Sequence, residues 1–270
     1  MRNNNRAILN KSESIQNLFK QFESLESFID NFSFLVFGRD NIICKNYVFF
    51  LQRILCSSQA TLGNIIECCK CFCLADAYTL LRKYRDDLFF SLYLVNYDVN
   101  IKNGITKRMN KIETNIEQWC KNNLSNLNIS EVLATIGSSD RIKDAVRQFD
   151  LQKSFDQIGT QLNNYTHGNG YSFYNSNVVW VDAVDTEKQI KEIVSTAHYI
   201  TVTFLFLLVL CSPHYIMSTD YIDHLELGRT PPEDSQYWVA PFVVEFFKNN
   251  IGMIDENCYE YLKGNTCMDL

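Results

Sequence analysis

The chain has 270 residues, of which 46% are hydrophobic and 21% are charged, and its formal net charge at pH 7 is -6. That apolar share is enough for a buried core, whereas the negative charge excludes an attraction of the whole molecule to nucleic acid or anionic lipid. The sequence holds only 10 glycines and 4 prolines. Because β-sandwiches and barrels need frequent turn residues, this scarcity argues against them and predicts an all-α protein of long helices.

The N-terminal half reads as a series of amphipathic helices. Apolar side chains recur at helical spacing in residues 12–31, behind Ser12 or Ser14, either of which can cap the helix. After a short loop around Gly38, the pattern is helical from about residue 46 to residue 95, with a break near residues 74–76. Residues 96–109 are polar and turn-like, and they are the best candidate for an internal linker.

Shorter helices are expected in the second half of the chain, over 110–122, 129–136 and 139–149. Apolar residues from Leu151 to Tyr165 then mark another amphipathic helix, which Gly168 and Gly170 would stop. Ser218 is a plausible cap for a later helix, a further helix follows the prolines at 231 and 232, and the last is expected near 255–263.

One apolar segment has two interpretations. Residues 193–219 contain no Asp, Glu, Lys or Arg, so a helix that crosses a membrane has to be weighed. Serine and threonine side chains dilute its first half, however, and Pro213 ends its most apolar stretch. Several amphipathic helices elsewhere also need a common partner for their apolar faces. We therefore predict a multi-helix bundle around a central buried helix at about 186–212, without a membrane span.

The N-terminus has no apolar stretch typical of a secretory signal, so we expect one cytoplasmic α-helical domain over residues 1–270 with reduced thiols. The closely spaced Cys68 and Cys71, and the run Asp220, Asp223 and His224, have spacings that a metal site could use. Core-filling cysteines and a helix dipole explain these two patterns more simply. We expect no metal and no cofactor.

The most informative stretch surrounds His167. Asn163, Asn164 and His167 share the polar face of the helix that ends there. Two amides and an imidazole form a compact hydrogen-bonding set, and a histidine can serve as an acid or base near neutral pH. The alternative is structural, because a helix dipole favours His, and helix stops favour Asn and Gly, at a C-terminus.

Two arginines could complete this site. Arg82 and Arg85 lie one turn apart in an otherwise apolar helix, and a phosphate could be their partner if that helix packs beside the one ending at His167. Ordinary ion pairs offer another explanation of the charges, because Arg82 to Asp86 and Lys83 to Asp87 are both spaced four residues apart.

A polar Asn/His cluster at a helix end, accompanied by an Arg-bearing helix in an all-helical bundle, resembles the HEPN superfamily. The stretch from Leu80 to Asp87, Leu-Leu-Arg-Lys-Tyr-Arg-Asp-Asp, is similar to a group of bacterial HEPN-like proteins. The resemblance rests on about residues 60–170. It implies a HEPN-like core at about 45–212 with a helical extension at 213–270.

The resemblance also implies a function. Many HEPN proteins are metal-independent endoribonucleases of toxin–antitoxin or phage-defence systems, and they act as homodimers with a composite site. His167 would then be the acid or base, with Arg82 or Arg85 stabilising the phosphoryl group and RNA or a nucleotide as the partner. The family's Arg, four to six residues before its His, has no counterpart here, where Gln161, Leu162 and Asn163 stand. The alternative is a non-enzymatic helical module that binds a protein partner or a small anionic ligand.

Overall fold

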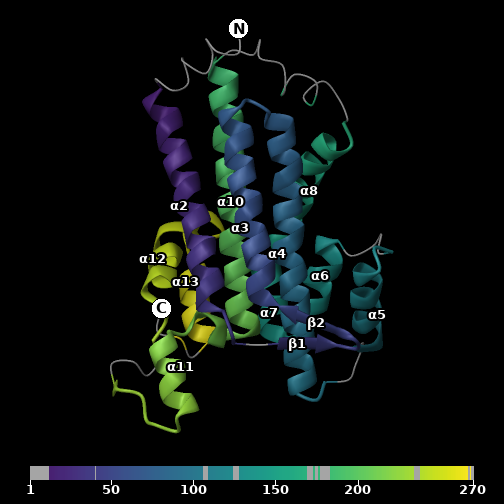
Figure 1. Cartoon of the computed structure of the whole chain (residues 1–270), viewed down its shortest axis with the longest axis vertical. Coiled ribbons are helices and arrows are strands. Elements are labelled where there is room, and N and C mark those ends of the chain that lie inside the picture. Colours follow the sequence, from purple (N-terminus) through teal and green to yellow (C-terminus); the bar gives the residue numbers. More distant parts are fainter. Residues whose placement is uncertain are drawn as a thin grey trace.

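Long α-helices build most of the chain. The computed structural model describes residues 12–39, 41–105, 109–123, 128–168, 173, 176, 183–233, 238–266 and 268. Figure 1 shows four long helices side by side, α2 (Glu13–Leu35), α3 (Leu51–Lys70), α4 (Leu74–Lys102) and α10 (Ala183–Cys211). Both α3 and α10 contact α2 and α4, so the four helices enclose a common core. The prediction of an all-α multi-helix bundle is confirmed.

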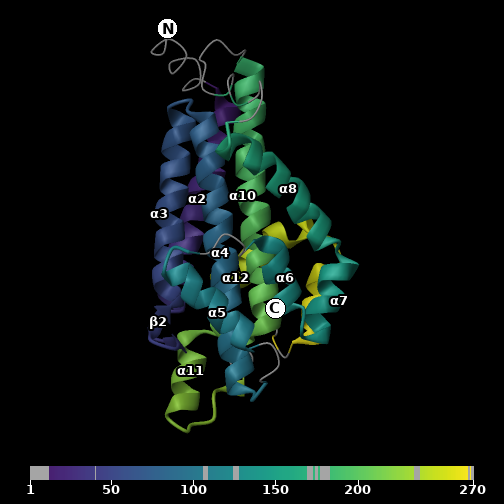
Figure 2. The ribbon, with the colours of Figure 1, turned by 90° about the vertical axis from the view of Figure 1, so that its right-hand side faces the viewer.

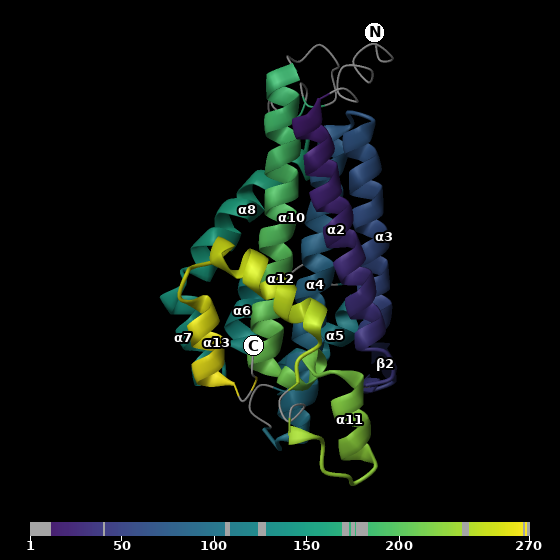
Figure 3. The same cartoon turned by 90° about the vertical axis from the view of Figure 1, so that its left-hand side faces the viewer.

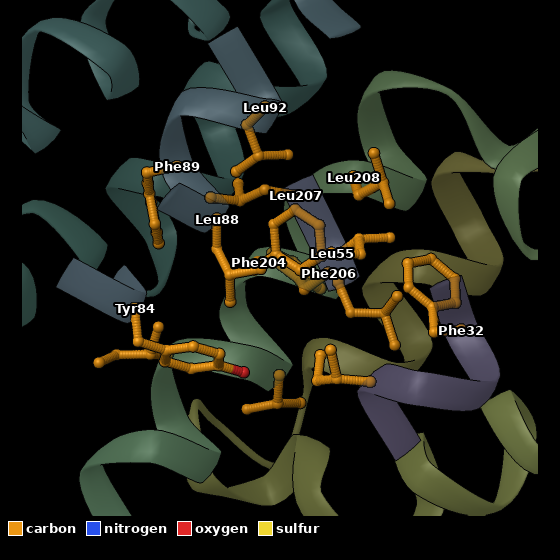
Figure 4. Close-up of a cluster of buried hydrophobic side chains, with 14 of the residues drawn as sticks. Phe32, Leu55, Tyr84, Leu88, Phe89, Leu92, Phe204, Phe206, Leu207 and Leu208 are labelled. Atoms are coloured by element: carbon orange, nitrogen blue, oxygen red, sulfur yellow. The ribbon is translucent and has the colours of Figure 1, made fainter. Parts of the chain in front are cut away.

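The apolar helix α10 is the centre of this core. Thr186–Cys211 is long and apolar enough to cross a membrane, with a mean hydropathy of 2.0, yet 78% of its most apolar window is buried inside the protein. Figure 4 shows Phe204, Phe206 and Leu207 among side chains from the neighbouring helices. Each such side chain stabilises the fold by about 1.5–3 kcal/mol relative to exposure. The predicted central buried helix at about 186–212 is therefore confirmed, beginning three residues earlier.

Residues 41–50 form a β-hairpin, which corrects the predicted loop and helix start. Strands β1 (Asn41–Cys44) and β2 (Tyr47–Phe50) are antiparallel, with Ile42 opposite Phe49 and Ile43 opposite Val48. β-branched and aromatic side chains favour this pairing. Ile42 and Cys44 face the core while Ile43 and Val48 face outward, so burial alternates with a period of two in β1, where the prediction assumed a helical period.

The predicted linker at 96–109 is also corrected, because α4 continues to Lys102. Asn96 and Asn100 are buried on the inner face of this helix. The turn comes only afterwards, at Asn103 and Gly104, whose positive φ of 68° suits glycine. Asparagine favours turns, but burial against neighbouring helices overrides that weak propensity.

Four shorter helices cover the other side of α4, close to their predicted positions: α5 (Met109–Cys120), α6 (Ile129–Ile136), α7 (Asp140–Gln148) and α8 (Leu151–Thr166). Figure 2 faces this side of the molecule. Helices α5, α6 and α8 all contact α4. These contacts cover the second half of α4, where every residue from Leu88 to Tyr97 is buried.

The C-terminal part wraps the opposite side of α10. After the short helix η1 (Pro213–Ile216), Ser218 caps α11 (Thr219–Glu226) by accepting the Tyr221 N–H at 3.3 Å, as predicted. Then follow α12 (Pro241–Asn250), η3 (Ile251–Met253) and α13 (Cys258–Asn265), and Figure 3 shows α12 crossing α10. The buried apolar residues form one continuous cluster from Ile15 to Met268.

Candidate functional site

His167 stands at the C-terminal end of α8, as the sequence predicts. Its backbone N–H donates to the Asn163 carbonyl at 3.0 Å, and Gly168 follows with a positive φ of 61°. A glycine adopts this left-handed conformation without steric cost, so the helix stops here. Gly170 lies outside the described residues. The side chains of Asn163, Asn164 and His167 are all exposed, and they form an accessible polar helix end.

Helices α4 and α8 pack against each other in antiparallel directions, which is the arrangement that the predicted site requires. The rings of Tyr78 and Tyr165 stack with centroids 4.0 Å apart, and those of Phe89 and Phe155 meet at 4.5 Å. Residue numbers thus rise along α4 as they fall along α8. We call this contact the α4–α8 seam. It places the arginine helix beside the histidine helix.

Arg85 is held inside the α4–α8 seam. Its side chain is only 7% exposed, and its Nε and Nη2 donate to Asp86 Oδ1 at 2.9 and 2.7 Å. Its Nη1 lies 3.4 Å from the position that a β-carbon on Gly159 would take. A buried guanidinium needs an anionic partner, and Asp86 supplies it. Arg85 is therefore placed to position Asp86 and has little surface to offer a ligand.

Arg82 is the more accessible arginine. Its side chain is 30% exposed, and its Nε lies 3.7 Å from Asp86 Oδ2, on the carboxylate oxygen that Arg85 leaves free. Lys83 pairs with Asp87. Both ion pairs expected from the four-residue spacing are thus present. The Arg82 pair is long and open to solvent, so it holds the guanidinium weakly and leaves it available to another anion.

The stacked tyrosines set the register between His167 and the arginines. From their common level, Arg82 lies four residues along α4 and His167 two residues the other way along α8, so the two positions are about 9 Å apart along the helix axes. Arg85 is level with Gly159 and is about 12 Å from His167 on the same measure. Within the described residues 12–39, 41–105 and 128–168, no hydrogen bond or ion pair joins His167 to either arginine.

Glu192 joins the same region from α10, and no sequence pattern predicts this. One of its oxygens accepts from the Tyr78 hydroxyl at 2.7 Å and the other from Gln161 Nε2 at 2.7 Å. Burial and this hydrogen bond both raise the pKa of Tyr78, so the phenol remains a donor at neutral pH. Glu192 belongs to the charged first turns of an apolar helix, where a carboxylate is ordinarily solvated. Only the packing of three helices reveals its contacts.

The alternative metal spacings find no support in the described part of the chain, where no group of three or more His, Cys, Asp and Glu could hold a metal ion. None of the described cysteines forms a disulfide, and burial raises the pKa of Cys68 and of Cys69. His224 turns its Nδ1 to the Asp220 carbonyl at 2.7 Å. We interpret these cysteine and histidine side chains as structural parts of their helices.

Comparisons with family models, curated proteins and solved structures find no match to this chain. The α4–α8 seam and the cavities are therefore the features that indicate a function for this chain.

Proposed function

We propose that this chain is a metal-independent endoribonuclease of the HEPN type, with its site at the His167 end of the α4–α8 seam. The observation that carries the proposal is the antiparallel contact of α4 with α8, fixed by the Tyr78–Tyr165 stack. It sets an exposed histidine and a partly exposed arginine on neighbouring helices, about 9 Å apart along their axes. His167 lies on the polar face of α8, away from the Tyr165 face, so an RNA strand that passes around the helix end would contact both groups.

Each group then has a role in cleavage. The His167 imidazole takes the proton of an RNA 2′-hydroxyl, the 2′-oxygen attacks the phosphorus, and the bond from phosphorus to the 5′-oxygen breaks as that oxygen takes a proton from water. The products are a 2′,3′-cyclic phosphate and a 5′-hydroxyl end. Arg82 stabilises the charge that develops on the phosphoryl oxygens. Arg85 is a positioning residue, because it holds the Asp86 carboxylate that also contacts Arg82. Asn163 and Asn164 supply amides that can bind the RNA backbone.

The resemblance, and not the seam, supports the biological part of the proposal. The chain would work in the bacterial cytoplasm as a toxin or phage-defence effector, with two copies forming a composite site. Its net charge of -6 means that RNA must approach a local patch and not the whole surface.

The test is cleavage of a defined RNA by the purified full-length chain in the presence of a metal chelator. We expect cleavage that stops when the scissile 2′-hydroxyl is replaced by hydrogen, and that falls about 100-fold or more in His167→Ala. The control for His167→Ala is His224→Ala, on the exposed helix α11. The control for Arg82→Ala is Arg147→Ala, on α7. Equal cleavage by His167→Ala, or none by the unmodified chain, contradicts the proposal.

A second candidate is a non-enzymatic module that binds an anion or a protein partner at the same helix end. The burial of Arg85 favours it, because only Arg82 of the two arginines is left to contact a phosphate. In that case RNA or another anion would bind without being cut. Filter binding beside the cleavage assay separates the two functions: Arg82→Ala would lower affinity while no product appears with any variant.

A further inference from the structure

A second potential site lies at the far end of α4. A cavity of about 760 Å³ is bounded by the last turn of α4, by α5 and α6, and by the start of α7. Asn100, which lines it, is about 33 Å along α4 from Tyr78, so the cavity is separate from the His167 site. Its volume falls in the range of about 300–1,000 Å³ that small-molecule sites occupy. The cavity is therefore large enough for an organic ligand.

Asn100 gives the cavity an unused hydrogen-bonding group. The residue is only 8% exposed, and its side-chain amide has no hydrogen-bond partner among the residues that the structure describes. Other half-buried amides nearby are used, as Asn115 Nδ2 donates to the Tyr93 hydroxyl at 3.0 Å. Because Asn100 lines the cavity, its amide is accessible to a ligand that binds there.

Lys143 brings positive charge to the wall of the cavity. Lys143 lines it and is exposed, with no ion pair to any described residue, whereas Lys111 is paired with Glu131 at 2.6 Å. Ser139 is the N-cap of α7, yet its hydroxyl makes no capping hydrogen bond. The start of a helix favours an anion, although Asp140 in the first turn offsets part of that field. Together, the Lys143 ammonium, the Ser139 hydroxyl and the start of α7 could bind one small anionic group.

Part of the remaining wall is apolar, beside the polar Thr135 and Ser138. Ile105, Ile112 and Ala134 line the cavity, and Ile105 keeps 46% of its surface exposed. We propose that this cavity binds a small organic anion, with its acidic group at Lys143 and the start of α7, its apolar body against Ile112 and Ala134, and a polar group at Asn100. Hydrophobic walls with a few placed polar groups are the usual composition of such sites.

The test uses 8-anilinonaphthalene-1-sulfonate, a fluorescent organic anion, titrated into the folded full-length chain. We expect one saturable site, from which decanoate displaces the dye and decyltrimethylammonium does not. Lys143→Glu and Asn100→Leu should each weaken binding about tenfold or more. Lys248→Glu, an exposed lysine on α12, is the control for the charge reversal.

Ala134→Trp gives an independent measurement. Residue 134 is exposed at the cavity wall, so the indole can enter the cavity without disturbing the core, and we expect dye binding to disappear. Unchanged affinity in Lys143→Glu, or equal displacement by the cationic and anionic competitors, would overturn the proposal. Because these residues are remote from His167, RNA cleavage should be unaffected in all three variants.

Discussion

Arg85 of α4 lies against Gly159 of α8, with its Nη1 3.4 Å from the point where a β-carbon at residue 159 would stand. A methyl group there would touch the guanidinium at ordinary van der Waals distance, whereas a longer side chain would have to displace it. Glycine inside a helix also costs about 0.5–1 kcal/mol relative to alanine. The absence of a side chain at 159 thus leaves room for the buried arginine.

Substitutions at Gly159 follow from this contact. We expect Gly159→Ala to raise the free energy of unfolding by about 0.5 kcal/mol through helix propensity. Gly159→Leu should lower it by about 1–3 kcal/mol because the side chain overpacks the seam. Urea denaturation measures both. Gly264 of α13 is the matched control, since nothing lies within 4 Å of its added β-carbon. A Gly159→Leu protein as stable as Gly264→Leu would contradict the contact.

Asp86 is the common partner of both arginines, but its loss should act mainly through Arg85. Asp86→Ala leaves a guanidinium that is only 7% exposed without its carboxylate, and we expect a loss of about 2 kcal/mol in stability. Lys83→Ala breaks a pair whose lysine is 50% exposed, and it should cost less than about 1 kcal/mol. Chemical denaturation at matched ionic strength compares them. Equal effects of the two variants would show that Arg85 does not need Asp86.

The central helix makes a prediction about fractionation. Because 78% of the most apolar window of α10 is already covered by protein, little of it is left for lipid. We expect the full-length chain to remain in the supernatant after detergent-free lysis and ultracentrifugation. Phe206→Ala, in the fully buried C-terminal part of this helix, should lower stability by about 3–5 kcal/mol. Recovery of the folded chain only with detergent would contradict the buried arrangement.

His198 should make stability depend on pH. Burial lowers its pKa from the usual 6.5, and its Nδ1 contacts the Val194 carbonyl at 2.9 Å. Since the unfolded chain then binds more protons, the stability that neutral His198 contributes is present above about pH 6.5 and lost as pH falls through the lower folded pKa. The slope due to one group is at most about 1.4 kcal/mol per pH unit.

The measurement for His198 is the free energy of unfolding between about pH 7.5 and pH 5.5. His198→Gln should lose less stability over this interval than the unmodified chain. Glu245 of α12 lines the same small cavity of about 240 Å³, so Glu245→Gln checks whether the carboxyl contributes. A parallel loss in His198→Gln and the unmodified chain would assign the pH dependence to other groups.

Helix positions were the most predictable feature. Residues 129–136 form α6 as expected, and α8 ends at His167 because a glycine follows that tolerates a positive φ. The hairpin at 41–50 was missed because seven apolar residues in ten fit both helical and strand periods over so short a stretch. Pairing of Ile43 with Val48 across the turn is a contact between two segments, which a single helical period does not represent.

The candidate sites also contain some residues that the sequence predicted and others that only the structure revealed. The sequence located His167, Asn163 and Asn164 on one polar helix face, since three- and four-residue spacing fixes neighbours within a helix. It did not place Glu192 or Asn100, whose surroundings come from other helices.

Local rules therefore determined the all-α class, the helix ends and the apolar character of α10, because each depends on residues within a few turns. Only the tertiary structure decided that Arg85 turns inward to Asp86 while Arg82 stays partly open, and that a cavity remains beside Asn100. Those outcomes depend on which helix faces meet. Helix-to-helix contacts join residues far apart in the chain, so no periodicity along it specifies them.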